Sequence, residues 1–325
     1  MSSTCPALAD VLARYAAVSS APRLHAIEAR LRAPVSVAVV GRPGVGRGAV
    51  ARALTGAGVG VVADAADVRV VVIAEALKPE DRRALRGDRP SVVVVNKADL
   101  SGRVVGGPLA AARRVADDIA VDVGRPAVPM VAHLADVVLD DQLIDALRAL
   151  AAAPADLASV DAFVGSEHVV PMPVRQRLLE RLDRFGLAHA VLAVVEGEDA
   201  VSVAAGLRKV SQVDDVVAKL ADVGAEVGYR RVRAALAELQ RTATESRDDD
   251  LAAFLASDEV VIAVMAAAVA VVEASGVGVD PGDDPDAHLR RALRWRRYAD
   301  GPLGALHRRC AADISRGSLR LLGEV

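Results

Sequence analysis

Short apolar runs alternate with helical patterns through the first half of the chain. The runs that indicate strands cover residues 35–40, 69–74, 91–95 and about 127–131, with a shorter candidate at 59–62. Helical patterns fall near residues 49–55, 79–86, 108–119 and 139–151. Strands that alternate with helices are typical of a parallel sheet with helices on both faces. We therefore predict an α/β domain over residues 33–151.

Strand patterns stop after residue 151. Apolar residues then step along helical faces, as in the stripe Leu178, Leu182 and Phe185, with Gly224 expected to end one later helix. The polar run 242–250 and the Gly- and Asp-rich run 275–284 are expected to be loops. Residues 152–325 are therefore predicted to form an all-α helical domain.

The first segment of the chain is also predicted to be helical. Residues 6–32 read as an amphipathic helix with a break near Pro22. We expect this segment, residues 1–32, to pack on the carboxyl-terminal helical bundle. The longest apolar run, residues 260–272, is thirteen residues long, whereas a bilayer core takes about twenty, so a buried helix is favoured over a membrane span.

Two loops after predicted strands have the residue types of a nucleotide site. The glycine-rich segment after the first strand offers backbone N–H groups and a helix N-terminus to an anion. The sequence Asn-Lys-Ala-Asp after residues 92–95 ends in a carboxylate that can accept two parallel hydrogen bonds from a guanine edge, which adenine cannot donate. The candidate nucleotide-binding residues are Gly41, Gly44, Gly46, Arg47, Gly48, Asn96, Lys97, Asp99 and Ala132.

In these motifs and their order, the chain resembles the translation-factor-related P-loop GTPases, within them the Era-like and bacterial dynamin-like G domains. The resemblance covers roughly residues 35–150. It implies that the lysine stem lies along the base and that Asn96 links its loop to the phosphate-binding segment. In the stretch 128–133, only Ala132 fits the family's last base-contacting loop.

The chain departs from this family where hydrolysis is performed. Arg47 stands in place of the P-loop lysine, and Gly48 stands where the family has an Mg²⁺-binding hydroxyl. Only eighteen residues separate Gly48 from Asp67, too few for both switch segments and their strands, and the Asp-x-x-Gly motif is missing. We expect weak binding of GTP or GDP, doubtful binding of Mg²⁺, no catalytic residues and no detectable hydrolysis.

Charge, cysteine content and the start of the chain bear on partners, metal sites and location. A net charge of −3 predicts no nucleic-acid partner. Two cysteines far apart in sequence, Cys5 and Cys310, and six scattered histidines predict no metal site and no disulfide framework. The chain does not open with a basic and then apolar leader, so a cytoplasmic location is expected.

Arginines gather near the carboxyl end, where nine lie between residues 290 and 320. A solvated helical face, a protein interface and a contact with anionic lipid are the alternatives. The candidate interface residues are Arg290, Arg291, Arg294, Trp295, Arg297, Arg308 and Arg309.

Three functional hypotheses remain open. The first is a catalytically inactive, GTPase-like partner or regulator of an intact GTPase, paired with another such protein or with itself. The second is an active GTP-hydrolysing, dynamin-like protein. The third is a scaffold or peripheral membrane protein that uses the basic carboxyl-terminal helices.

Overall fold

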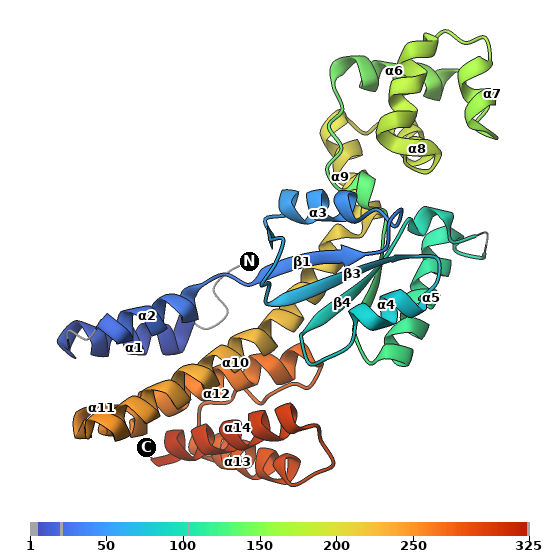
Figure 1. Cartoon of the computed structure of the whole chain (residues 1–325). Coiled ribbons are helices and arrows are strands. Elements are labelled where there is room, and N and C mark those ends of the chain that lie inside the picture. Colours follow the sequence, from blue (N-terminus) through green and yellow to red (C-terminus); the bar gives the residue numbers. More distant parts are fainter. Residues whose placement is uncertain (1–5, 20–21, 103, 324–325) are drawn as a thin grey trace. The chain divides into compact units, whose positions relative to one another are not determined.

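The computed structural model describes residues 6–19, 22–102 and 104–323. It divides into two compact units, which are described separately (Figure 1). Unit 1 comprises Met1–Val35 and Leu220–Val325, and unit 2 comprises Ser36–Lys219. The division therefore groups the helices up to residue 219 with the sheet, whereas the sequence pattern predicted a domain boundary at residue 151.

Unit 2 is built on a five-stranded sheet whose strands are all parallel, in the order β2-β1-β3-β4-β5. The strands are β1 (Ser36–Gly41), β2 (Gly60–Val61), β3 (Val68–Ala74), β4 (Ser91–Asn96) and β5 (Ala127–Met130). The predicted fold class, an α/β domain with a parallel sheet followed by an all-α region, is confirmed.

Helices cover the sheet because its central strands are apolar on both faces. Helices α4 (Pro79–Ala84) and α5 (Gly107–Val123) pack on the face formed by Val71, Ile73, Val93 and Val95. Helix α3 (Arg47–Gly56) packs against β1 and β2, and Figure 1 shows it on the opposite side of the sheet from α4. After β1 the chain thus passes to one face of the sheet, and after β3 it passes to the other face. A reversal of this kind creates a crevice at the carboxyl ends of the strands.

The rest of unit 2 is helical. Two short 3₁₀ turns, η1 (Ala98–Leu100) and η2 (Ala132–Leu134), follow β4 and β5. Helices α6 (Asp141–Ala152), α7 (Val160–Gly165), α8 (Met172–Val195) and α9 (Ala200–Ser211) come next. Their buried side chains join Ala98, Val131 and Leu134 in one apolar cluster, so these helices pack directly on the loops at the carboxyl edge of the sheet.

Unit 1 contains two apolar clusters. In the first, α1 (Pro6–Ser19) and α2 (Pro22–Arg32) pack with the long helix α10 (Val213–Ser246), α11 (Asp249–Ala256) and α12 (Asp258–Ala274). The second joins α10 and α12 to α13 (Pro285–Ala299) and α14 (Ala305–Gly323) around Trp295. In the described part of the chain no single helix is long and apolar enough to cross a bilayer. Helices α11 and α12 reach the necessary length and hydrophobicity only when taken together, and they are bent by 49° relative to each other.

Two local predictions for the helical region are wrong. Helix α10 continues through Gly224 and ends at Ser246, so residues 242–246 are helical and not a loop. The buried stripe Leu220, Val223 and Val227 continues on both sides of Gly224. Burial of this stripe outweighs the cost of a glycine inside a helix, which is about 1 kcal/mol.

Candidate functional site

Asn96, at the end of β4, connects three loops at the carboxyl edge of the sheet. Its side-chain Nδ2 donates a hydrogen bond to the carbonyl oxygen of Val45 in the glycine-rich loop, at 2.9 Å. Its Oδ1 accepts one from the backbone N–H of Ala132 in η2, at 3.1 Å. The side chain is buried, so both bonds are shielded from water. Asn96 therefore fixes the β1–α3 loop relative to the loop after β5.

Two glycines allow the β1–α3 loop to lie this close to its neighbours. A Cβ on Gly41 would lie 2.4 Å from the carbonyl oxygen of Val72 in β3. A Cβ on Gly46 would lie 2.3 Å from Nδ2 of Asn96, and the φ of Gly46 is +90°. Both positions therefore need glycine, for close approach and, at Gly46, also for a left-handed backbone.

A cavity of about 280 Å³ opens beside this loop, between the carboxyl ends of β1, β3 and β4. This is the crevice that the reversal of chain direction creates. Its volume lies just below the usual range of ligand pockets, roughly 300–1,000 Å³. The cavity is lined by Arg42, Pro43, Gly44, Val45, Ala74, Glu75, Lys78, Lys97, Leu100 and Ser101.

Charged side chains at the cavity are partly paired. Arg42 donates from Nε to both carboxylate oxygens of Asp81, each at 3.1 Å, and Asp81 is buried. Lys78 and Lys97 are exposed and, within the described part of the chain, form no ion pair. Glu75 is the acidic side chain in the lining. The cavity thus presents two free ammonium groups and one carboxylate.

The predicted nucleotide-binding residues do not all lie at this cavity. Gly44 and Lys97 line it, and Asn96 lies beside it through its bond to Val45. Arg47 and Gly48 form the exposed first turn of α3 and lie outside the lining.

Lys97 directly precedes η1, and Asp99 lies within it. Lys97 adopts a left-handed conformation, with φ 60° and ψ 38°. Asp99 is half-buried, and this burial raises the pKa of its carboxyl group. Asp183 of α8 raises that pKa further, whereas His133 and Lys97 lower it. The charges that shift the pKa of Asp99 thus belong to the neighbouring Lys97, to His133 of η2 and to Asp183 of α8.

Three residues at the site, Arg42, Lys78 and Asp81, were missed by the sequence analysis, and so was Asp183, whose charge raises the pKa of Asp99. A signal existed for Asp81, because a proline followed two residues later by a carboxylate is typical of a helix start. In the structure Asp81 accepts a hydrogen bond from the backbone N–H of Lys78 at 2.9 Å. No pattern in the sequence pointed to Asp183.

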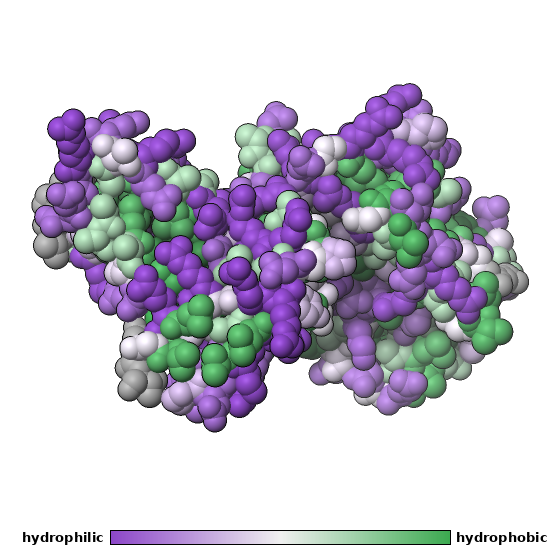
Figure 2. Space-filling model, turned by 90° about the horizontal axis from the view of Figure 1, so that it is seen from below, coloured by the Kyte–Doolittle hydropathy of each residue, from purple (hydrophilic) through white to green (hydrophobic). Residues whose placement is uncertain are grey.

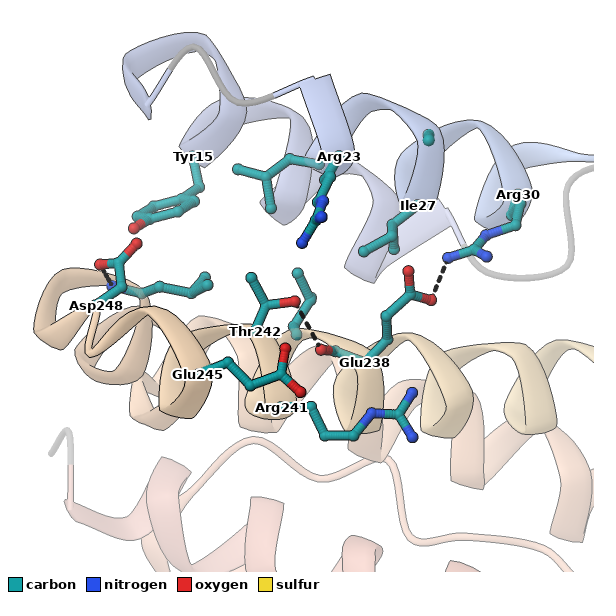
Figure 3. A pocket seen from close by; sticks show the side chains of 13 residues that line it. Tyr15, Arg23, Ile27, Arg30, Glu238, Arg241, Thr242, Glu245 and Asp248 are labelled. Carbon is teal, nitrogen blue, oxygen red and sulfur yellow. Dashed lines mark hydrogen bonds and ion pairs between the residues drawn. The ribbon is translucent and has the colours of Figure 1, made fainter.

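A second, larger cavity lies in unit 1 between α2, α10 and α11, with a volume of about 750 Å³ (Figure 3). Its walls are apolar at Leu24, Ile27 and Leu239, and Figure 3 shows Arg23 extending from α2 toward α10. Arg30 pairs with Glu238 across it. Three arginines and three carboxylates line the cavity, so its charges offset one another and favour neither an anionic nor a cationic ligand.

The predicted arginine-rich interface needs correction at two residues, Arg291 and Trp295, which are buried. The Arg291 guanidinium donates to Oγ of Ser318 at 3.0 Å and to the carbonyl oxygens of Asp280 and Gly282 at 2.8 Å each. Its internal partners draw it into the bundle. The other members of the predicted interface remain exposed: Arg290, Arg294, Arg297, Arg308 and Arg309.

Other reactive groups give no further site in the described residues. No group of three or more His, Cys, Asp or Glu side chains there is arranged to hold a metal ion. Cys310 is buried, which raises the pKa of its thiol to about 12 and leaves it unreactive near neutral pH. Cys5 lies outside the described residues.

Comparisons of the chain with protein-family models, with curated proteins and with solved structures gave no match.

Proposed function

We propose that unit 2 is a guanine-nucleotide-binding domain of the GTPase type that does not hydrolyse its nucleotide. The observation that carries this proposal is the position of Asn96, whose amide bonds to the glycine-rich loop on one side and to η2 on the other. A phosphate-binding loop and a base-reading loop must keep a fixed separation to hold one nucleotide. Asn96 supplies that fixed separation.

The base would lie against Lys97 and Asp99. The carboxylate of Asp99 accepts hydrogen bonds from guanine N1–H and the exocyclic amine, and adenine would leave it unpaired. Ala132, whose N–H is already bonded to Asn96, positions the loop on the other side of the base. The partial burial of Asp99 disfavours its ionised carboxylate. A ligand that donates two hydrogen bonds to this carboxylate replaces the solvation that Asp99 loses on burial.

The phosphates would occupy the 280 Å³ cavity. Lys78 and Lys97 supply positive charge there, together with the backbone N–H groups of the glycine-rich loop. Glu75 lines the same cavity and repels additional negative charge. The small volume and this carboxylate favour a diphosphate over a triphosphate.

Hydrolysis is absent in this proposal because the groups that act on a terminal phosphate are missing. Gly48 offers no hydroxyl to a magnesium ion, and Arg47, exposed at the start of α3, is not part of the cavity lining. The loss of one electrostatic stabiliser typically lowers a rate by about 10²–10³. Several losses together leave a domain that binds without turnover and acts through protein contacts, with another GTPase-like protein or a second copy of this chain as its partner.

The test is equilibrium binding of fluorescent GDP, GTP and ADP to the full chain, with and without Mg²⁺. We expect saturable binding of GDP in preference to ADP, little dependence on Mg²⁺, and loss of the preference in Asp99→Ala. Asp118→Ala, an exposed aspartate of α5, is the matched control and should bind as the wild type does. Equal binding of ADP and GDP would overturn guanine recognition. Phosphate release from GTP that depends on Mg²⁺ would overturn the absence of hydrolysis.

A second candidate function, contact with an anionic membrane surface, is favoured by one observation on α13. Leu289 and Leu293 are 41% and 54% exposed and alternate along the helix with Arg290, Arg294 and Arg297. Figure 2 views the molecule from the side of α13 and α14 and shows a hydrophobic patch bordered by hydrophilic side chains. Exposed apolar residues flanked by arginines fit the boundary between acyl chains and anionic headgroups.

Co-sedimentation with vesicles tests this second candidate. Binding to phosphatidylserine vesicles should fall when salt is raised and when Leu289 and Leu293 are both replaced by serine. Vesicles of phosphatidylcholine alone should bind less protein. Sedimentation that is unaffected by either change would remove this function.

A further inference from the structure

One buried carboxylate, that of Asp81, holds two cationic residues of the 280 Å³ cavity. Asp81 lies in the first turn of α4, and its side chain has no contact with solvent. Each of its two oxygens accepts a hydrogen bond from Nε of Arg42 at 3.1 Å. Oδ2 also accepts one from the backbone N–H of Lys78 at 2.9 Å. Arg42 and Lys78 both line the cavity, whereas Asp81 lies behind them, outside the lining.

The guanidinium of Arg42 keeps most of its donors available. An arginine has five N–H donors, and Asp81 engages only the one on Nε. Within the described part of the chain, the four donors on Nη1 and Nη2 bond to no protein acceptor, and neither nitrogen is enclosed by protein. The Arg42 side chain is only 22% exposed, so it does not extend freely into solvent. Asp81 thus fixes the guanidinium and leaves both Nη groups open to a ligand.

This ion pair lies at the crevice formed by the reversal of chain direction. Arg42 directly follows β1, Asp81 follows β3, and these strands are neighbours in the sheet. Figure 1 shows α3 and α4, which begin near the two residues, on opposite sides of the sheet. The pair therefore bridges the two loops that border the crevice. Stability alone explains such a pair poorly, because apolar residues in place of a buried ion pair are often as stabilising.

We propose that Arg42 is a phosphate-binding residue of the cavity and that Asp81 positions it; this inference rests on the proposed guanine-nucleotide-binding function. The planar fork of a guanidinium donates two parallel hydrogen bonds to phosphate oxygens. Nη1 and Nη2 of Arg42 supply these donors to a bound diphosphate. Arg47, which stands in place of the P-loop lysine, is exposed outside the lining. Arg42 thus takes over the contact that this lysine would make, and Lys78 and Lys97 add charge.

The experiment measures dissociation constants of guanosine, GMP and GDP by calorimetry, for the full-length wild type and Arg42→Lys. Lysine keeps a positive charge beside Asp81 but has no Nη groups. We expect the affinity for GDP to fall roughly tenfold, because hydrogen bonds to a charged group are lost. The affinity for guanosine should stay unchanged. Arg83→Lys, at an exposed position of α4, is the control and should keep all three affinities.

Asp81→Asn tests the positioning role. Asparagine has nearly the shape of aspartate and can still accept a hydrogen bond, but it carries no charge. A neutral acceptor holds the Arg42 guanidinium about half as strongly, so GDP should bind roughly fivefold more weakly. Simple electrostatics predicts the opposite, since removing a negative charge near the cavity strengthens its attraction for phosphate. Tighter binding of GDP to Asp81→Asn would therefore overturn the positioning role.

The remaining outcomes distinguish this inference from the function on which it rests. Guanine-selective binding with an unchanged ratio of GDP to guanosine affinity in Arg42→Lys would overturn the role of Arg42 alone. A loss of guanosine and GDP affinity by the same factor would show a structural effect and would also overturn it. Absence of saturable GDP binding in the wild type would overturn the proposed function, and this inference with it.

Discussion

The side-chain amide of Asn96 donates to the carbonyl oxygen of Val45, 2.9 Å away, and joins two loops that lie 51 positions apart in the sequence. The same side chain accepts from the N–H of Ala132. Asn96→Ala would leave both partners without their bond in a buried region. A buried polar group that loses its partner costs about 1–3 kcal/mol. We expect a loss of stability of this size for unit 2, measured by urea denaturation.

The matched control for Asn96 is Asp117→Ala, which changes an exposed side chain of α5 in the same unit. It should unfold at the wild-type urea concentration. If Asn96→Ala has the same midpoint and binds GDP as the wild type does, the link between the loops contributes nothing to either stability or the site.

Gly46→Ala should cost more stability than Gly44→Ala. Both glycines have positive φ, +90° and +83°, so both substitutions carry the left-handed penalty of about 1–2 kcal/mol. A Cβ on Gly44 meets nothing within 4 Å, whereas one on Gly46 would overlap Nδ2 of Asn96. The difference between the two free energies of unfolding therefore measures the contact with Asn96. Equal losses would mean that Asn96 moves away freely.

Arg42 and Asp81, which form a buried ion pair, should be strongly coupled in their effects on the free energy of unfolding. Arg42→Ala leaves the buried Asp81 carboxylate with only the N–H of Lys78, and breaking a buried pair typically costs about 3–5 kcal/mol. Because Arg42 is partly exposed, we expect the lower end, about 3 kcal/mol. Arg47→Ala, five positions along and exposed, is the control. A double-mutant cycle with Asp81→Ala tests the coupling, and additive effects would contradict it.

Much of the sheet could be predicted because its central strands, β3 and β4, are rich in valine and buried on both faces. Residues 92–95 show why: four valines in a row, between Ser91 and Asn96, fit a buried strand and little else. The family resemblance implied the link from Asn96 to the glycine-rich loop, whereas its bond to the N–H of Ala132 was not predicted. Such local patterns determine which loops meet at the carboxyl edge.

The rest could not be predicted because it depends on tertiary contacts. Asp183 occupies a helical stretch, and its glycine-like backbone is imposed by His133 and Leu134 from a distant loop. Arg291 reads as one member of an exposed basic cluster, and only the carbonyl groups around it explain its burial. Neither feature has a periodicity or a spacing that a sequence pattern could reveal.

Asp99→Asn should stabilise the protein at neutral pH while it removes guanine selectivity. Burial raises the pKa of Asp99 above its ordinary value of 3.8, so the folded state binds more protons than the unfolded state in the interval between the two pKa values. The free energy of unfolding therefore falls as pH rises through that interval. Asparagine removes this penalty. The gain in stability should be largest near pH 7 and should shrink as pH falls toward 3.8, as followed by urea denaturation at several pH values.

Arg291→Ala should destabilise unit 1, whereas Arg290→Ala should leave its stability nearly unchanged. The two arginines are neighbours on α13, but the Arg291 guanidinium is buried and bonded to Ser318 and to two backbone carbonyls, while Arg290 is exposed. Truncating Arg291 leaves buried acceptors unpaired, at a cost of about 2–3 kcal/mol. Surface ion pairs such as that of Arg290 contribute only about 0–1 kcal/mol. Thermal unfolding of both variants checks this, and equal stability would show that Arg291 belongs to the exposed cluster after all.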